Sequence, residues 1–274
     1  MNLPKRDFAA MRPAEIAAAE PSAWIAVLPL GATEQHGPHL PPETDAIIAE
    51  GVARRLASAV PENLPVTFLP TETVGYSPEH LDFPSTRSLA YDEAIRRWVG
   101  IGETLAEQGI RKLLLLNAHG GNSPLMTVVA TELRRRRAML CVATSWTRHL
   151  TAGPASERER EIGIHGGDVE TSVMLALRPG LVRMDLAEDF ASNQVVFARK
   201  FAHLRAYGPH AFGWKIQDLN PAGAVGNAAA ASARKGEALL DMATRGLCRL
   251  MEDIHKFDMR SFDENVPADK PNRR

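Results

Sequence analysis

Four consecutive leucines at residues 113–116 place the tightest limit on how this chain folds. Successive side chains of a strand point to opposite faces, so a strand made of this run needs apolar cover on both faces. The apolar run at residues 24–30 has the same character. Strands buried on both faces are typical of parallel sheets with helical connections. The sequence therefore predicts an α/β fold, with a mostly parallel sheet between two helical layers.

Short apolar segments alternate with helical patterns along most of the chain. Strands are expected at about 23–30, 66–70, 112–117 and 139–146, and helices at about 14–19, 44–60, 91–108, 123–137, 168–179 and 228–255. Thr44 and Asp168 are candidate N-caps. Residues 148–162 are expected to be irregular, residues 185–225 to be rich in loops, and the tail after Asp258 to be mobile. We expect a single domain over residues 1–274, with its core at about 22–257.

The charge and the cysteines limit the partners and the compartment. The 274 residues carry a formal net charge of −1, which argues against nucleic acid or an anionic membrane as the main partner. No apolar stretch reaches the roughly 18 residues of a membrane span, and the N-terminus lacks the apolar core of a signal peptide. Cys141 and Cys248 suggest no disulfide framework. We therefore expect a cytoplasmic protein.

A dense group of polar residues follows the first predicted strand. Glu34, His36 and His39 lie in the loop that leaves this strand, and Asp45 lies at the start of the next helix. In extended chain, Glu34 and His36 would project to the same side. Carboxylates and imidazoles that converge are typical ligands of divalent transition metals. The alternative is that these are ordinary polar loop residues.

Two later loops carry similar groups at the same predicted edge of the sheet. His119 lies in a Gly-rich turn after the leucine run, where it is either functional or merely caps a carbonyl group. Glu170 follows His165 by five positions. Glu170 is either a metal ligand or an acid stabilised by the dipole of its helix. Ligands of open α/β sheets bind beyond the carboxyl ends of the strands, which is where these loops meet.

Together these loops supply two histidines and three carboxylates for a two-metal site with one bridging carboxylate. Such a site polarises a carbonyl group and lowers the pKa of bound water. His165 would then pass a proton to a leaving nitrogen. The candidate metal ligands are Glu34, His36, Asp45, His119 and Glu170.

Five motifs follow one another along the chain, at residues 34–41 with Asp45, 79–86, 117–122, 165–172 and 221–227. In this order they closely resemble the creatininase (creatinine amidohydrolase) family. The resemblance implies a three-layer αβα sandwich, two divalent metal ions (Zn, Mn or Fe), hydrolysis of a carbon–nitrogen amide bond, and a homohexamer. By position, Glu34 and His119 would hold one metal ion, His36 the other, and Asp45 would bridge them; His165 matches the catalytic histidine.

Two departures from the creatinine-hydrolysing pattern bear on the substrate. Gly121 stands where those members carry a glutamate, so Glu170 is expected to complete the second site, and Ser85 stands where a glycine is usual. We therefore expect a small-molecule amide, cyclic amide or formamide other than creatinine, with a peptide-processing role as an alternative. Two further alternatives are a catalytically silent binding or assembly protein and a phosphate-binding enzyme that uses the turn at residues 120–123.

Overall fold

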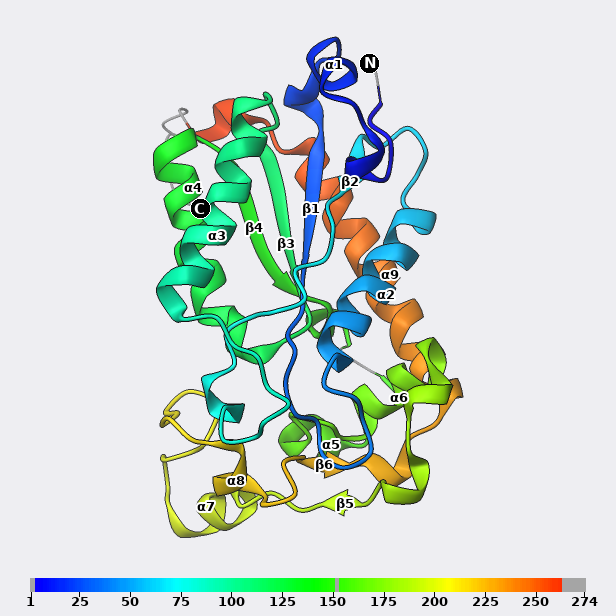
Figure 1. Cartoon of the computed structure of the whole chain (residues 1–274), viewed down its shortest axis with the longest axis vertical. Helices are drawn as coiled ribbons and strands as arrows, with labels where there is room; N and C mark the ends of the chain where they lie inside the picture. The colour runs from blue at the N-terminus through cyan, green and yellow to red at the C-terminus, as the bar shows by residue number, and fades with distance from the viewer. Residues whose placement is uncertain (1–2, 151–152, 263–274) are drawn as a thin grey trace, which may run out of the picture.

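Four parallel strands form the centre of the computed structural model, which describes residues 3–150 and 153–262. Their order across the sheet is β2-β1-β3-β4 (Figure 1). The strands are β1 (Ile25–Leu30), β2 (Val66–Phe68), β3 (Lys112–Asn117) and β4 (Leu140–Ser145). All three pairings are parallel, so the predicted mostly parallel sheet is confirmed.

The leucine run lies at the centre of this sheet and faces both ways. Leu113 and Leu115 join one apolar core cluster, while Leu114 and Leu116 join the other. All four side chains are at most 1% exposed. The alternation explains why a continuous apolar run was needed here, because each helical layer receives every second side chain.

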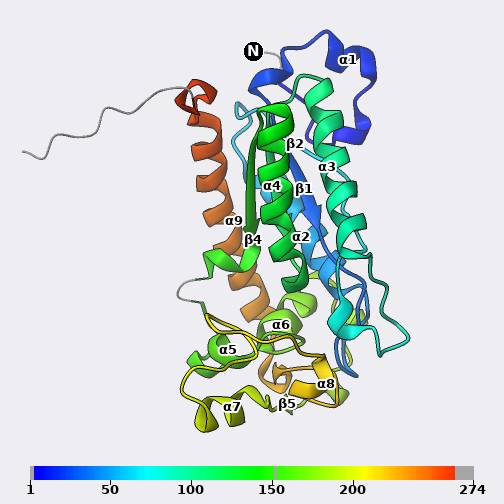
Figure 2. The ribbon, with the colours of Figure 1, turned by 90° about the vertical axis from the view of Figure 1, so that its left-hand side faces the viewer.

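Helices cover both faces of the sheet, as the sequence predicts. On one face lie α3 (Tyr91–Glu107) and α4 (Ser123–Arg137); on the other lie α2 (Thr44–Ala59) and α9 (Ala233–Lys256). Figure 2 shows α3 and α9 on opposite sides of the sheet. The three-layer αβα sandwich is therefore confirmed.

Short elements gather beyond the carboxyl ends of the strands, at the bottom of Figure 1. The helices there are α5 (Glu157–Ile162), α6 (Asp168–Leu177), α7 (Gln194–Lys200) and α8 (Ile216–Leu219). A small antiparallel pair, β5 (Asp189–Phe190) with β6 (Gly226–Asn227), lies among them. The remaining helix, α1 (Pro13–Ala17), lies at the opposite end. The edge of the sheet that the motifs share is thus enclosed by later parts of the chain.

Helices α6 and α9 approach each other closely at a glycine. A Cβ atom at Gly236 would lie 1.9 Å from the backbone oxygen of Ser172. Nearby, the Asp168 carboxylate accepts hydrogen bonds from Ser172 Oγ (3.0 Å) and Lys235 Nζ (2.7 Å). These contacts fix the first turn of α6, which carries Glu170.

Both predicted N-caps are wrong by one residue. The N-cap of α2 is Glu43, and the Thr44 hydroxyl donates to the backbone oxygen of Pro41 instead. The N-cap of α6 is Gly167, because the Asp168 side chain turns to Ser172 and Lys235 rather than to its own helix end.

Other element boundaries also differ from the expectations. Residues 148–162 are not irregular throughout, because α5 forms there. Its N-cap is Ser156, whose hydroxyl oxygen accepts a hydrogen bond from the backbone nitrogen of Glu159. Helix α9 begins at Ala233, and Ala228–Ala230 form a separate 3-10 turn. The predicted mobile tail is helical at Met259–Phe262, and residues 263–274 lie outside the described part. No helix in the described part combines the length and apolarity that crossing a membrane requires.

Candidate metal centre

The residues that the motifs singled out meet at the carboxyl edge of the sheet. Glu34 and His36 follow β1, Asp45 lies in the first turn of α2, and His119 follows β3. Glu170 reaches the same place from the first turn of α6. Parallel strands place their exits at one edge, so positions far apart in the sequence become neighbours here.

Asp45 lies between two histidines and offers one oxygen to each. Its Oδ1 atom lies 3.3 Å from His36 Nε2, and its Oδ2 atom lies 3.1 Å from His119 Nδ1. Glu34 Oε1 lies 3.2 Å from the same nitrogen of His119. Glu170 Oε2 lies 3.8 Å from His36 Nε2.

These distances define two adjacent sets of potential ligands. Glu34, Asp45 and His119 offer atoms that all lie within 4.8 Å of one another, and so do His36, Asp45 and Glu170. Asp45 belongs to both sets. The structure thus brings together all five predicted ligands, and their role as metal ligands stays a prediction.

Backbone carbonyl groups fix how two of the histidines present their nitrogens. His36 Nδ1 lies 2.9 Å from the Glu34 carbonyl oxygen, and His119 Nε2 lies 2.9 Å from that of Tyr76. A carbonyl oxygen only accepts, so each of these nitrogens carries the proton. In the neutral rings, the lone pairs of His36 Nε2 and His119 Nδ1 then face the carboxylates, an arrangement typical of metal-binding histidines.

Several buried atoms of the centre have no hydrogen-bond partner among the described residues. They include both carboxylate oxygens of Glu34, Asp45 Oδ2 and His36 Nε2. Glu34 is 0% exposed and Asp45 only 1%. Burying unpaired charge is costly unless an opposite charge compensates it, and cations between these atoms would do so. The residues present therefore fit divalent metal ions.

Electrostatics in the centre favour charged histidines when no cation is present. Burial alone would lower the pKa of His36, but Asp45, Glu170 and Glu34 raise it to about 10. The pKa of His119 is likewise raised, because the attraction of Glu34 and Asp45 outweighs burial. Burial raises the pKa of Glu170 to about 7 against the opposing effect of His36. The two histidines thus hold protons at positions where a cation would replace them.

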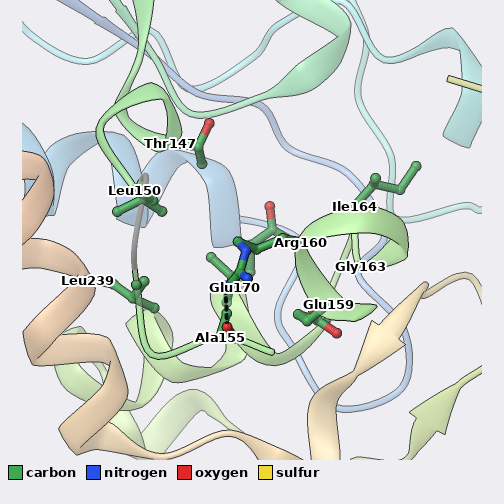
Figure 3. A pocket seen from close by; sticks show the side chains of 12 residues that line it. Thr147, Leu150, Ala155, Glu159, Arg160, Gly163, Ile164, Glu170 and Leu239 are labelled. Atoms are coloured by element: carbon green, nitrogen blue, oxygen red, sulfur yellow. Dashed lines mark hydrogen bonds between the residues drawn. The ribbon is translucent and has the colours of Figure 1, made fainter. Parts of the chain in front are cut away.

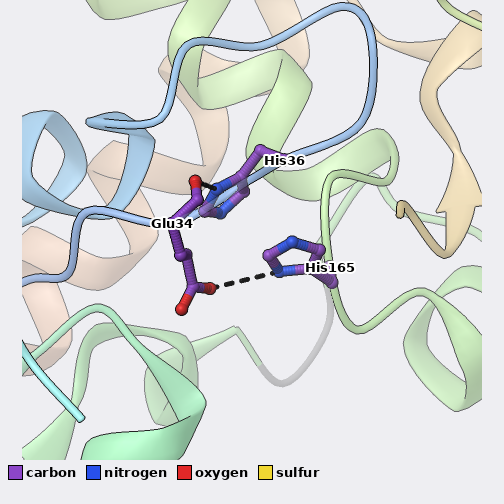
Figure 4. Close-up of side chains that lie close together, drawn as sticks. All are labelled: Glu34, His36 and His165. Carbon is purple, nitrogen blue, oxygen red and sulfur yellow. Dashed lines mark hydrogen bonds and ion pairs between the residues drawn. The ribbon is translucent and has the colours of Figure 1, made fainter. Parts of the chain in front are cut away.

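His165 lies beside the ligand sets and is anchored to the loop after β1. Its Nε2 atom donates to the Gln35 carbonyl oxygen at 2.6 Å, and its Nδ1 atom lies 3.5 Å from Glu34 Oε1 (Figure 4). Its ring centroid is 4.1 Å from that of His36. Burial lowers the pKa of His165, and His36 adds to this effect. With Glu34 and His36 it forms a further potential ligand group, so the geometry allows both a proton-transfer role and a ligand role.

Glu79 and His80 complete the surroundings of the centre. His80 Nε2 lies 3.6 Å from Glu34 Oε1, and Glu79 Oε1 lies 3.9 Å from His119 Nε2. A Cβ atom at Gly121 would lie 2.4 Å from the Tyr76 backbone oxygen, 2.5 Å from His119 Nε2 and 3.0 Å from Glu79 Oε1, so a side chain there would force these neighbours to shift. Sequence reasoning assigned neither residue a role in the centre, although both lie in the motif at residues 79–86, which is the signal that could have found them.

His39 and Trp146 lie away from the potential ligand atoms. His39 Nε2 lies 2.9 Å from Thr171 Oγ1 and ties the first loop to α6. Trp146 is 1% exposed and packs in the core cluster under α9. Both positions are structural in character.

A cavity of about 470 Å³ opens onto the centre. Besides the site residues, an aromatic wall from the loop before α8 lines it, formed by Tyr207, Phe212 and Trp214. This volume lies within the range of roughly 300–1,000 Å³ that is usual for small-molecule sites. The centre is therefore accessible to a substrate of modest size.

The fold and the site define an α/β protein with two adjoining sets of potential metal-ligand residues at the carboxyl edge of a parallel sheet. The chain belongs to the creatininase family, whose model, described as creatinine amidohydrolase, matches residues 9–251. This match confirms the resemblance seen in the motifs and supports the assignment of the chain as a hydrolase.

Relatives of two kinds are similar to this chain. It is 31% identical to a mycofactocin precursor peptide peptidase of Mycobacterium tuberculosis, over 82% of this chain and 85% of the relative. It is 29% identical to a creatinine amidohydrolase of Pseudomonas putida, over 81% and 86%. A solved mutant creatininase of the Zn–Zn type matches with a TM-score of 0.72 at 26% identity, covering 93% of this chain and 100% of that one. A creatininase structure described with Mn matches with a TM-score of 0.70 at 25% identity, over 93% and 100%.

Proposed function

We propose that this protein is a metal-dependent amidohydrolase that cleaves a carbon–nitrogen amide bond with a water molecule activated by two divalent ions. The observation that carries the proposal is the position of Asp45, whose two oxygens face two different histidines. Similar solved structures described with zinc and with manganese support these metals, and iron is the third candidate.

Each residue of the centre has a distinct role in this proposal. Glu34 and His119 would hold the first ion, His36 and Glu170 would hold the second, and Asp45 would contribute a carboxylate oxygen to each site. When bound, two such ions polarise the amide carbonyl and lower the pKa of water toward neutrality. Glu170 is needed because Gly121 offers no side chain.

His165 moves the proton in this proposal. Its Nε2 atom stays protonated through the hydrogen bond to the Gln35 carbonyl, which leaves Nδ1 free on the side of Glu34. Nδ1 takes a proton from the attacking water and delivers it to the leaving nitrogen. The anchor at Gln35 keeps the ring oriented in both steps.

Two substrate classes fit the site. A small cyclic amide or formamide suits the cavity of about 470 Å³, and Gly121 argues against creatinine itself. A short peptide is the second candidate, because a relative at 31% identity is named a peptide peptidase. We further propose that the protein is cytoplasmic, does not bind nucleic acid, and assembles as a homohexamer.

The test is a substrate panel with protein loaded with zinc, manganese or iron. The panel contains cyclic amides, formamides and short peptides, and the released amine or carboxylate is measured. Hydrolysis that disappears on chelation and returns with metal supports the proposal. Metal binding without hydrolysis of any amide would favour the silent binding protein, and phosphate-dependent activity without metal would favour the phosphate-binding alternative.

A further inference from the structure

A second cavity lies directly beside the cavity that opens onto the metal centre. It has a volume of about 410 Å³ and is bounded by α5, the start of α6 and the side of α9 (Figure 3). We call it the Arg160 chamber. The lining side chains used below are Leu150, Arg160, Ile164, Val169, Glu170 and Leu239.

The chamber and the metal-site cavity share part of their walls. Ile164 and Glu170 line both. Glu170 also faces the centre, where its Oε2 atom lies 3.8 Å from His36 Nε2. A substrate group in the chamber would therefore lie one side chain away from the place of the second ion.

Most of the chamber wall is apolar. Leu150, Val169 and Leu239 approach it from three different segments, and Ile164 lines both this chamber and the metal-site cavity. Burial of an aliphatic group against such a wall removes apolar surface from water, which favours binding. The wall thus suits an apolar group of a substrate.

Arg160 is the one cation that lines the chamber among the described residues. Its Nη1 atom donates to the Ala155 backbone oxygen, and it forms no ion pair within the described part of the chain. Its planar guanidinium has five donors, so most remain available for a carboxylate.

The two carboxylates that line the chamber are already engaged elsewhere. Glu159 accepts from the backbone nitrogens of Asp168 (2.6 Å) and Asn227 (2.9 Å). Glu170 accepts from the backbone nitrogen of Gly166 (2.6 Å) and faces His36. Neither forms an ion pair with Arg160 in the described part of the chain, so the chamber combines an apolar wall with a cation that has no carboxylate partner there.

We propose that the Arg160 chamber is a substrate subsite that binds a free carboxylate next to an apolar side chain. The substrate is then an amide of an apolar amino acid, or a short peptide ending in one, with its scissile bond at the metal centre. This inference rests on the proposed function and selects a substrate class for the same site. A neutral cyclic amide or formamide would leave the chamber empty.

Paired substrates test the inference. One pair is N-formyl-leucine and N-formyl-leucinamide, and the other is a dipeptide ending in leucine and its C-terminal carboxamide. Within each pair, the two substrates differ only in the negative charge. The metal-loaded protein should show a KM at least tenfold lower for each free acid than for its amide. Arg160→Gln should remove this difference by raising the KM for the free acids, while Arg160→Lys restores part of it.

Arg158→Gln is the matched control. Arg158 lies on the same helix but pairs with Asp189 at 2.6 Å and does not line the chamber. This variant should retain the full preference for the free acids. A preference that Arg160→Gln leaves intact, or that Arg158→Gln also removes, would overturn the assignment of Arg160.

A binding measurement separates this inference from the proposed function. Calorimetric titration of zinc-loaded protein with leucine and with leucinamide should show tighter binding of leucine, and Arg160→Gln should abolish the difference at unchanged zinc content. Hydrolysis of amides without discrimination by charge would defeat the inference alone. Absence of hydrolysis for every amide would contradict the proposed function. If Arg160→Gln also left the affinity for leucine unchanged, the assignment of the chamber as a carboxylate subsite would be wrong as well.

Discussion

The Oδ1 atom of Asp45 lies 3.3 Å from Nε2 of His36, and the other oxygen of the same carboxylate faces a second histidine. One side chain from the first turn of α2 thus joins both ligand sets. Since each set also has a carboxylate of its own, each can be weakened separately, whereas a change at Asp45 affects both. Substitutions at Glu170 and at Asp45 should therefore change the metal content differently.

Glu170→Gln should weaken the second ion and leave the first largely in place. The amide keeps the size of the side chain but loses the negative charge that faces His36 at 3.8 Å. A calorimetric titration of this variant with zinc should show one tight site and one strongly weakened site. If Glu170 were only an acid at the helix end, the stoichiometry would stay at two ions, and stability would fall by roughly 0.3–1 kcal/mol.

Glu79→Gln is the matched comparison for that variant. Glu79 lies 3.9 Å from His119 but belongs to neither proposed ligand set. We expect this variant to bind two ions. Loss of one ion in Glu79→Gln, with both retained in Glu170→Gln, would assign the ligand role to Glu79 instead.

His165→Ala should keep both metal ions and lose most turnover. A general acid–base group contributes roughly a hundredfold or more to the rate, and kcat should fall by that factor. Elemental analysis of the purified variant provides the check on metal content. Metal lost together with activity would make His165 a ligand, a role that its distance of 3.5 Å from Glu34 also allows.

Removing the metal ions should destabilise the protein. The buried carboxylates of Glu34 and Asp45 would lose the charges that compensate them. A ligand present at one hundred times its Kd stabilises the folded state by about 2.7 kcal/mol per site. Thermal unfolding with and without chelator should therefore show a lower Tm for the metal-free protein, restored by zinc. An unchanged Tm would contradict metal binding at buried charges.

Lys112→Met should destabilise the fold without affecting metal content. Lys112 Nζ donates to the backbone oxygens of Ile254 (2.7 Å), His255 (2.9 Å) and Phe257 (2.8 Å) at the end of α9. Losing hydrogen bonds from a charged donor should lower the free energy of unfolding by about 2 kcal/mol. Urea denaturation measures the change.

Lys256→Met serves as the control for Lys112→Met. Lys256 is exposed, and its ion pair with Glu252 has a distance of 3.8 Å. Its replacement should change the free energy of unfolding by less than about 0.5 kcal/mol. Equal effects of the two substitutions would show that the buried contacts at the end of α9 contribute little.

The layers and the loops of the centre could be predicted because their signals are local. The leucine run defines a doubly buried strand, and Glu34, His36 and His119 directly follow strands whose ends must share an edge. Only the family resemblance, and no local signal, predicted the grouping of Asp45 with both histidines. This grouping depends on how α2 packs against the sheet.

The features that sequence reasoning missed depend on contacts between distant segments. Helix α5 has an almost entirely charged sequence and so lacks the apolar periodicity that indicates a helix. Asp168 has a typical capping side chain, yet Lys235 and Ser172 compete for it. Glu79 and His119 lie on different loops, and only the packing of these loops brings Glu79 Oε1 to 3.9 Å from His119 Nε2.

The metal content of Asp45→Ala tests the central claim most directly. Wild-type protein loaded with zinc should contain two ions per chain by elemental analysis, and the variant should lose both, because both ligand sets share this carboxylate. Asp45→Asn, which keeps the size of the side chain, guards against misfolding, and circular dichroism confirms the fold of each variant. Loss of both ions from folded variants is the result that we predict. Two ions retained in a folded Asp45→Ala variant would contradict the bridged centre.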